Sequence, residues 1–366
     1  MNGRELEEYL SRGVEKIVQD VLKASFHNPG ASLFMAQHLM DSRQAGKKRQ
    51  EAEKKNSHIP PFLIASITNL CNLHCKGCYA RATKGCEDHA CQSGLLTGDE
   101  WSDIFGQAEE LGIEFILLAG GEPFMRKDVL TVAGNHRKIL FPVFTNGTMI
   151  REESLELLEK NRNLLPVLSI EGDRQTTDER RGAGVYDRIA DTMKMLKKKG
   201  ILFGASVTVS KENLDEVLSE KFLTGLYEAG TKAVVFVEYV PMDTASRDSA
   251  LGDAEREKMR ERLQNLRQSD FPMLLISFPG DEKTSGGCLA AGRGFFHINA
   301  TGGAEPCPFS PYSDTNVRNT SLLEALRSPL FLRLQESGSL TQEHIGGCTL
   351  FEQRKQVEEL LSEVSA

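Results

Sequence analysis

The stretch Phe62-Leu-Ile-Ala-Ser-Ile-Thr-Asn-Leu-Cys71-Asn-Leu-His-Cys75-Lys-Gly-Cys78 joins a short apolar run to three closely spaced cysteines. The run Phe62–Ile67 is typical of a buried strand. Three thiols in the loop behind it suit a cubane iron–sulfur cluster, because they would bind three irons and leave the fourth open to a small molecule. Zinc is the alternative, but a zinc site needs a second close pair, and Cys86 and Cys91 are spaced differently.

From residue 60 onward, short apolar runs alternate with amphipathic helices. One helix is expected at Asp99–Leu111, entered by a capping box of Thr97 and Glu100, and another at Tyr186–Lys199 before Gly200. This alternation predicts an α/β fold with a parallel sheet, either doubly wound or a full or partial (β/α) barrel. The expected strands are Phe62–Ile67, Glu114–Leu118, Val143–Thr145, Val167–Ile170, Phe203–Val209 and Ala233–Val240.

Both ends of the chain differ from this central part. Residues 1–57 predict two helices packed on the main domain, interrupted at Asn28-Pro29-Gly30, with the second through Phe34 and Met40. A helix that binds a partner or a membrane surface is the alternative. After residue 285, the segments Phe295–Asn299 and Glu305–Cys307 predict a hairpin. Two helices are expected behind it, at Ser321–Gln335 and Thr349–Glu363. The expected divisions are a helical segment at 1–57, a barrel at 58–284 and a small C-terminal domain at 285–366.

The composition is that of a globular protein, with 40% hydrophobic and 26% charged residues. A net charge of −8 argues against a nucleic-acid partner, which usually requires a basic face. No apolar run approaches the roughly 20 residues of a membrane-spanning helix, and Arg4 and Glu5 begin no signal peptide. We therefore expect a cytoplasmic protein, in which clustered cysteines indicate metal binding or catalysis more than disulfides.

Further polar motifs follow the later strands. Gly120-Gly121-Glu122-Pro123 lets the backbone approach a ligand closely, and Glu122 can accept a hydrogen bond from a cation. Asn146 ends the third expected strand and Ser169 lies on the fourth. Arg181, with Arg180 as an equal candidate, follows and suits a carboxylate partner. Each motif alone is an ordinary surface turn, but chemistry in a barrel gathers at these strand ends.

Taken together, these motifs resemble the radical S-adenosylmethionine superfamily, over roughly residues 60–245 with a weaker match to the end. The resemblance implies a partial (β/α)6 barrel of the TIM type, with a [4Fe–4S] cluster on Cys71, Cys75 and Cys78. Many members have an aromatic residue before the third cysteine, where this chain has Gly77 and places Tyr79 after it. S-adenosylmethionine is expected to contact Gly120, Gly121, Glu122, Asn146, Ser169, Arg181 and Tyr79.

The remaining cysteines predict a second metal centre. Cys288, Cys307 and Cys348, with four residues between Gly302 and Cys307, resemble the opening of a SPASM extension or the shorter twitch extension. The longer cysteine run of a complete SPASM domain is absent, so we expect one auxiliary iron–sulfur cluster. Three buried thiols without metal are the alternative. Cys86 and Cys91 remain candidates for flexible loop thiols, an extra ligand or a catalytic thiol.

The resemblance implies reductive cleavage of S-adenosylmethionine to a 5′-deoxyadenosyl radical, which abstracts hydrogen from a substrate. A flavodoxin or ferredoxin would supply the electron. The substrate is expected to be a peptide or protein, or else a small molecule or metallocofactor precursor. A non-catalytic iron–sulfur scaffold or electron carrier is a third hypothesis, but a carrier has no need of the motifs at the strand ends. No catalytic side chain is assigned from the sequence.

Overall fold

The computed structural model describes residues 29–83, 85–86, 94–242, 246–269, 271–341 and 348–365. The first expected helix, ahead of Pro29, lies outside the described residues, and so does Cys91.

Ten strands of the described chain form one sheet, in the order β10-β9-β8-β1-β2-β3-β4-β5-β6-β7. Strands β1 to β7 pair in parallel with their neighbours in chain order, β8 joins β1 in parallel, and β9 and β10 run antiparallel. Because β7 and β10 are free edges, the barrel is open. The strands are β1 Phe62–Thr68, β2 Phe115–Gly120, β3 Phe141–Thr145, β4 Leu164–Ser169, β5 Gly204–Val209, β6 Ala233–Glu238, β7 Leu274–Phe278, β8 His297–Ile298, β9 Gly303–Glu305 and β10 Thr315–Asn316.

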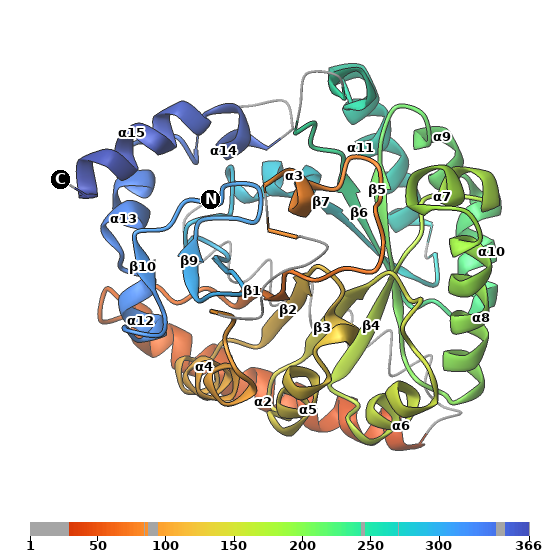
Figure 1. Cartoon of the computed structure of the whole chain (residues 1–366), viewed down its shortest axis with the longest axis horizontal. Coiled ribbons are helices and arrows are strands. Elements are labelled where there is room, and N and C mark those ends of the chain that lie inside the picture. The colour runs from red at the N-terminus through yellow and green to blue at the C-terminus, as the bar shows by residue number, and fades with distance from the viewer. Residues whose placement is uncertain are drawn as a thin grey trace.

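Helices cover the outer face of the curved sheet, and a group of C-terminal helices lies beyond β10 (Figure 1). In the core below them, Trp101 and Phe105 of α4 are fully buried, and Phe105 packs on Phe141 of β3. The helices are α2 Pro29–Glu53, α3 Tyr79–Ala82, α4 Gly98–Leu111, α5 Lys127–Asn135, α6 Glu152–Lys160, α7 Arg174–Arg181, α8 Val185–Lys198, α9 Leu214–Val217, α10 Glu220–Ala229, α11 Asp253–Gln268, α12 Leu322–Ala325, α13 Pro329–Glu336, α14 Thr349–Glu352 and α15 Arg354–Ser365, with short 3-10 turns at η1 Pro123–Met125, η2 Arg247–Ser249 and η3 Gly280–Ser285.

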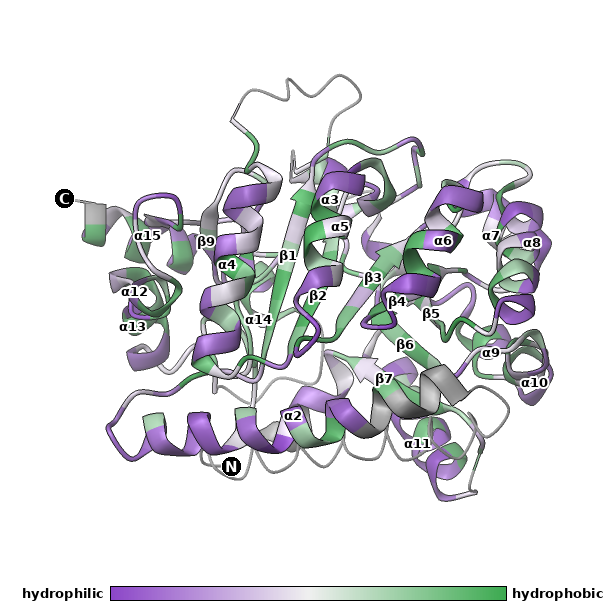
Figure 2. Ribbon diagram, turned by 90° about the horizontal axis from the view of Figure 1, so that it is seen from below, coloured by the Kyte–Doolittle hydropathy of each residue, from purple (hydrophilic) through white to green (hydrophobic). Residues whose placement is uncertain are grey.

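Helix α2 crosses the end of the sheet at which the strands begin, away from the cysteine loop (Figure 2). A buried ion pair fixes it there: Arg49 Nη2 lies 2.5 Å from Glu114 Oε1, just ahead of β2. Arg49 also donates to the Gly112 carbonyl oxygen, and Ser42 donates to Glu114. The helix therefore closes the bottom of the barrel and leaves the opposite end to the site.

The six strands expected in the central part are confirmed, within three residues at each end. The seventh, β7, is absent from the sequence-based expectation. The expected helix Ser321–Gln335 is two helices, because Pro329 starts a new helix with Ser328 as its N-cap. The expected helix Thr349–Glu363 also divides, between α14 and α15. Within the described ranges, no helix is long and apolar enough to cross a membrane.

Candidate active site

The loop with Cys71, Cys75 and Cys78 leaves the carboxyl end of β1 and rests on the glycine pair after β2. The Gly121 amide donates to the Thr68 carbonyl oxygen at 2.8 Å, and the Glu122 amide to that of Leu70 at 2.7 Å. A Cβ atom on Gly121 would lie 2.0 Å from the Leu70 carbonyl oxygen, and one on Gly120 would lie 2.2 Å from that of Thr68. Only glycine permits this approach. The glycine pair therefore allows the backbone of the cysteine loop to lie directly against the end of β2.

The three thiols of this loop are partly exposed. Cys86 is buried beside Cys71, and a hydrogen bond from Cys86 lowers the pKa of Cys71 to about 6. Burial raises the pKa of Cys75, against the opposing charge of Arg181, whose Nη1 lies 4.0 Å from its Sγ. Guanidinium groups favour thiolates, which are the form that binds iron. The donor chemistry thus fits an iron–sulfur cluster.

A single metal ion fits less well. No three His, Cys, Asp or Glu side chains of the described chain converge as the ligands of one ion do. A cubane cluster has a different requirement, because each thiolate binds a separate iron and the sulfur atoms stay apart. The missing convergence on a single ion therefore does not count against an iron–sulfur cluster on these three thiols.

Glu122 is buried at the junction of β2 and β3. Its Oε1 accepts from Thr145 Oγ1 at 2.7 Å and from the Phe124 amide at 3.1 Å, and its Oε2 accepts from the Asn146 amide at 2.8 Å. Burial raises the pKa of Glu122 to about 7. The carboxyl group thus joins the ends of β2 and β3. This role is separate from the contact with a cation that the sequence predicts for Glu122.

Asn146 joins the end of β3 to the cysteine loop. Its Nδ2 donates to Asn72 Oδ1 at 2.9 Å, and Asn72 Nδ2 donates in turn to Thr148 Oγ1 at 2.8 Å. The Thr148 amide closes the ring with a hydrogen bond to Asn146 Oδ1. Asn146 therefore has a local structural role, in addition to the cofactor contact that the sequence predicts.

The end of β4 supplies a buried carboxylate beside two arginines. Ser169, the last residue of β4, is partly exposed, and two residues later Glu171 is fully buried. Arg180 Nη1 lies 2.6 Å from Glu171 Oε1, and Arg181 Nε lies 2.7 Å from the same atom. The Thr208 amide donates to Glu171 Oε2 at 2.9 Å. Glu171 is not among the site residues expected from the sequence, although an acidic residue ahead of an arginine pair is a usable signal.

Two tyrosines flank the cysteine loop. Tyr79 begins α3, and its ring packs against Phe309 with 4.9 Å between the centroids, toward the C-terminal cysteines. Tyr239, just after β6, lies over Gly77: a Cβ there would come 2.3 Å from the Tyr239 hydroxyl oxygen. An aromatic ring therefore lies against Gly77 of the cysteine loop, from the segment that follows β6. Nothing near residue 239 signals this in the sequence.

The C-terminal cysteines line one small pocket beside the barrel. Cys288 and Cys307 are buried, Cys348 is partly buried, and the thiols of Cys307 and Cys348 share a hydrogen bond. The walls are mostly apolar, from Val240, Phe278, Pro279, Phe295 and Phe309. Glu282 also lines this pocket, and burial raises its pKa to about 8. The three cysteines thus line one pocket, together with a carboxyl group that the sequence did not reveal.

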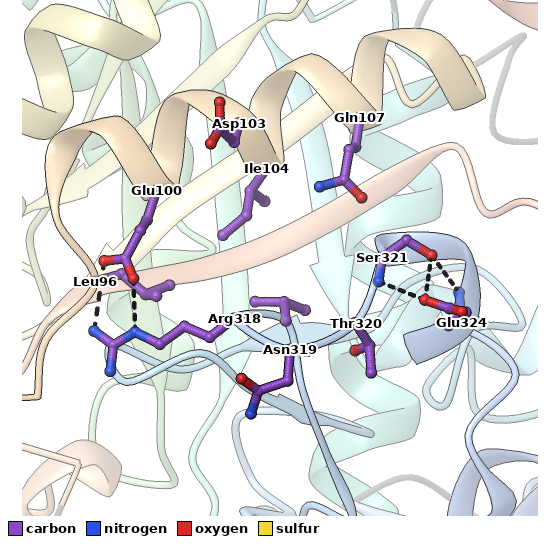
Figure 3. Close-up of a pocket in the computed structure, with 11 residues that line it drawn as sticks. Leu96, Glu100, Asp103, Ile104, Gln107, Arg318, Asn319, Thr320, Ser321 and Glu324 are labelled. Atoms are coloured by element: carbon purple, nitrogen blue, oxygen red, sulfur yellow. Dashed lines mark hydrogen bonds and ion pairs between the residues drawn. The ribbon is translucent and has the colours of Figure 1, made fainter.

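A second groove lies between α4 and the segment before α12 and holds none of the predicted site residues (Figure 3). Its polar side chains are paired with each other: Arg318 Nε lies 2.8 Å from Glu100 Oε1, and the Ser321 amide donates to Glu324 Oε2 at 2.7 Å. The Arg318–Glu100 pair joins the C-terminal segment to α4, as does the hydrogen bond from the Leu322 amide to Gln107 Oε1 at 2.9 Å. The Ser321–Glu324 pair caps the start of α12.

The open parallel barrel, with the cysteine loop at its mouth, is the part of this chain that carries a radical S-adenosylmethionine domain. Residues 65–221 match the family model described as the Radical SAM superfamily. Enzymes of this class carry a [4Fe–4S] cluster together with S-adenosylmethionine.

Among known proteins, the chain is similar to the AdoMet-dependent heme synthase of Methanosarcina barkeri, with 27% identity over 82% of this chain and 90% of that protein. It is 30% identical to the sporulation killing factor maturation protein SkfB of Bacillus subtilis, over 44% of this chain and 39% of SkfB. The fold is similar to that of Streptococcus suis SuiB bound to its precursor peptide SuiA, with a TM-score of 0.64, 20% identity, and coverage of 83% of this chain and 76% of that one.

Proposed function

We propose that Cys71, Cys75 and Cys78 hold the catalytic [4Fe–4S] cluster and that S-adenosylmethionine binds beside it at the barrel mouth. The observation that carries this proposal is the convergence on one loop of three thiols, a glycine pair that fixes the loop, and a guanidinium 4.0 Å from Cys75. When bound and reduced, the cluster supplies the electron that cleaves S-adenosylmethionine to a 5′-deoxyadenosyl radical, which takes hydrogen from the substrate.

The chain's own side chains position and shield this cofactor. Glu122 orients the turn Gly120-Gly121, where the methionine amino group is expected, by holding the ends of β2 and β3 together. The ion pair with Glu171 holds Arg181 beside the cysteine loop. The Nη1 atom of Arg181 there lies 4.0 Å from Cys75 Sγ. Asn146 and Ser169 lie at neighbouring strand ends, within the same rim.

We also propose an auxiliary cluster on Cys288, Cys307 and Cys348. Its support is the pocket that the three thiols share, with apolar walls that exclude water. Tyr79 and Phe309 form the aromatic contact between this pocket and the catalytic loop. An external one-electron donor of the flavodoxin or ferredoxin kind would reduce the catalytic cluster.

For the substrate, we favour a small molecule of the tetrapyrrole class. The similarity to the Methanosarcina heme synthase extends over 82% of this chain and 90% of that protein. A peptide is the second candidate, favoured by the similarity to SkfB and by the fold shared with SuiB.

A substrate-labelling experiment separates the two candidates. Anaerobic reactions contain reconstituted enzyme, dithionite, S-adenosylmethionine, and either an iron tetrapyrrole deuterated on its propionate side chains or a deuterated peptide library. Deuterium appearing in 5′-deoxyadenosine from the tetrapyrrole, with loss of mass from that compound, is the expected result. Transfer from peptides alone would contradict the tetrapyrrole proposal and favour the second candidate.

A further inference from the structure

The pocket of the three C-terminal cysteines holds a fourth donor. Glu282 lies in η3, six residues ahead of Cys288, and only 5% of its surface is exposed. Its backbone is fixed: the Glu282 amide donates to the Pro279 carbonyl oxygen at 2.7 Å, and its own carbonyl accepts from Gly287 at 3.2 Å. The carboxyl group is therefore held in the pocket by its turn.

The four side chains line one pocket and interact in pairs. The Cys288 thiol and the Leu289 amide form hydrogen bonds with the Glu282 carboxyl group, and Cys348 lies close enough to act on it electrostatically. Cys307 and Cys348 share a hydrogen bond. The sulfur atoms and the carboxyl group thus line the same small volume.

One oxygen of this carboxyl group has no partner. Among the described residues and their atoms, Glu282 Oε1 is buried and accepts no hydrogen bond. The nearby cation, Arg293, is directed elsewhere: its Nη1 donates to the carbonyl oxygens of Cys288 at 2.5 Å and Leu340 at 3.3 Å. A buried carboxylate oxygen without a partner is costly, so its presence beside three thiols indicates a cation that completes it.

An iron–sulfur cluster supplies such a cation. Three cysteines bind three irons of a cubane and leave the fourth without a protein ligand. Carboxylate oxygen is an established iron ligand in non-haem sites. No further cysteine of the described chain lines this pocket, since Cys86 lies beside Cys71 at the other site.

We propose that Glu282 is the fourth protein ligand of the auxiliary cluster, through its Oε1 atom. The inference rests on the auxiliary cluster of the proposed function. It assigns that cluster a closed ligand set of three thiolates and one carboxylate, which suits electron transfer. A cluster with an iron free to bind substrate would need this carboxylate to move away.

The test uses the full chain with Cys71, Cys75 and Cys78 changed to Ala, so that the auxiliary cluster is observed by itself. In this parent we compare Glu282→Gln, Glu282→Cys and the control Glu352→Gln, which removes an exposed carboxylate near Cys348. After anaerobic reconstitution, iron and sulfide are counted, and the reduced cluster is examined by electron paramagnetic resonance with and without 13C-cyanide.

The expected result is about four irons per chain in every variant, with 13C hyperfine coupling appearing in Glu282→Gln and in none of the others. Loss of the cluster from Glu282→Gln together with its retention in Glu282→Cys would equally support the proposal. Cyanide coupling in the parent, its absence from Glu282→Gln when the cluster is retained, or loss of the cluster from both Glu282 variants would overturn it. A parent without iron would instead refute the auxiliary cluster itself, and this inference with it.

Discussion

The Nη1 atom of Arg181 lies 4.0 Å from the Sγ atom of Cys75, while Glu171 holds the same guanidinium from the other side. A second link runs through the neighbouring backbone, because the Lys76 amide donates to the Arg180 carbonyl oxygen at 2.8 Å. Helix α7 and the cysteine loop are therefore joined twice, and the buried Glu171 determines where the positive charge lies.

We expect Glu171→Gln to destabilise the apoprotein by about 3–5 kcal/mol, since it leaves two arginines near a buried site without their carboxylate. Urea unfolding measures this free energy. Iron incorporation on reconstitution should also fall, because Arg181 is no longer held beside Cys75. Glu179→Gln, an exposed change on the same helix, is the control and should stay within about 0.5 kcal/mol. Equal effects of the two substitutions would contradict the anchoring role of Glu171.

The same ion-pair network predicts a pH dependence. Burial raises the pKa of Glu171, but Arg180 and Arg181 outweigh burial and hold it below the ordinary value of 4.5. The network therefore contributes its full stability above pH 4.5 and loses it as the pH falls through the lower pKa of the folded state. The stability difference between wild type and Glu171→Gln should shrink below pH 4.5, as measured by urea unfolding. If the stability difference between wild type and Glu171→Gln instead grows below pH 4.5, this prediction is wrong.

Gly121→Ala should displace the cysteine loop. The added Cβ would meet the Leu70 carbonyl oxygen at 2.0 Å, and strain of this kind costs about 1–3 kcal/mol. We expect a lower melting temperature and fewer irons bound after reconstitution. Gly106→Ala is the matched control: its Cβ meets nothing within 4 Å in α4, so it should stabilise the helix by up to about 1 kcal/mol. Normal iron binding by Gly121→Ala would argue against the proposed clamp.

Gly77 and Tyr239 should show coupled effects. Gly77→Ala brings its Cβ against the Tyr239 hydroxyl group, and the φ of +64° adds about 1–2 kcal/mol of backbone strain. Removing the ring in Gly77→Ala/Tyr239→Ala relieves the contact but not the strain, so part of the lost stability should return. A double-mutant cycle by thermal unfolding measures this coupling. Strictly additive effects would mean that the ring does not lie over Gly77.

Much of the fold was predictable because the strand and helix periods are strong between residues 62 and 240. The sequence also located the cysteine loop and the motifs at the strand ends, because these are continuous segments with distinctive residue types. Strand β7 was missed because Leu274–Phe278 is short and lies next to a proline, and Pro329 divided a helix that looked continuous.

The side-chain partners were harder to predict. Tyr239 reaches Gly77 from a strand far along the chain, and Glu282 meets Cys307 and Cys348 only through the packing of the C-terminal segment. The roles of Glu122 and Asn146 in joining strand ends depend on hydrogen-bond geometry, which residue types alone do not specify. Contacts between distant segments were therefore the hardest part of the site to predict from residue types.

The central claim is that Cys71, Cys75 and Cys78 support reductive cleavage of S-adenosylmethionine. Its most direct test measures 5′-deoxyadenosine by mass spectrometry after anaerobic incubation of reconstituted enzyme with dithionite and S-adenosylmethionine. We predict 5′-deoxyadenosine from the wild type and none above background from the variant with all three residues changed to Ala, which should still retain the auxiliary cluster. No 5′-deoxyadenosine from iron-loaded wild type, or equal amounts from both proteins, would contradict the account.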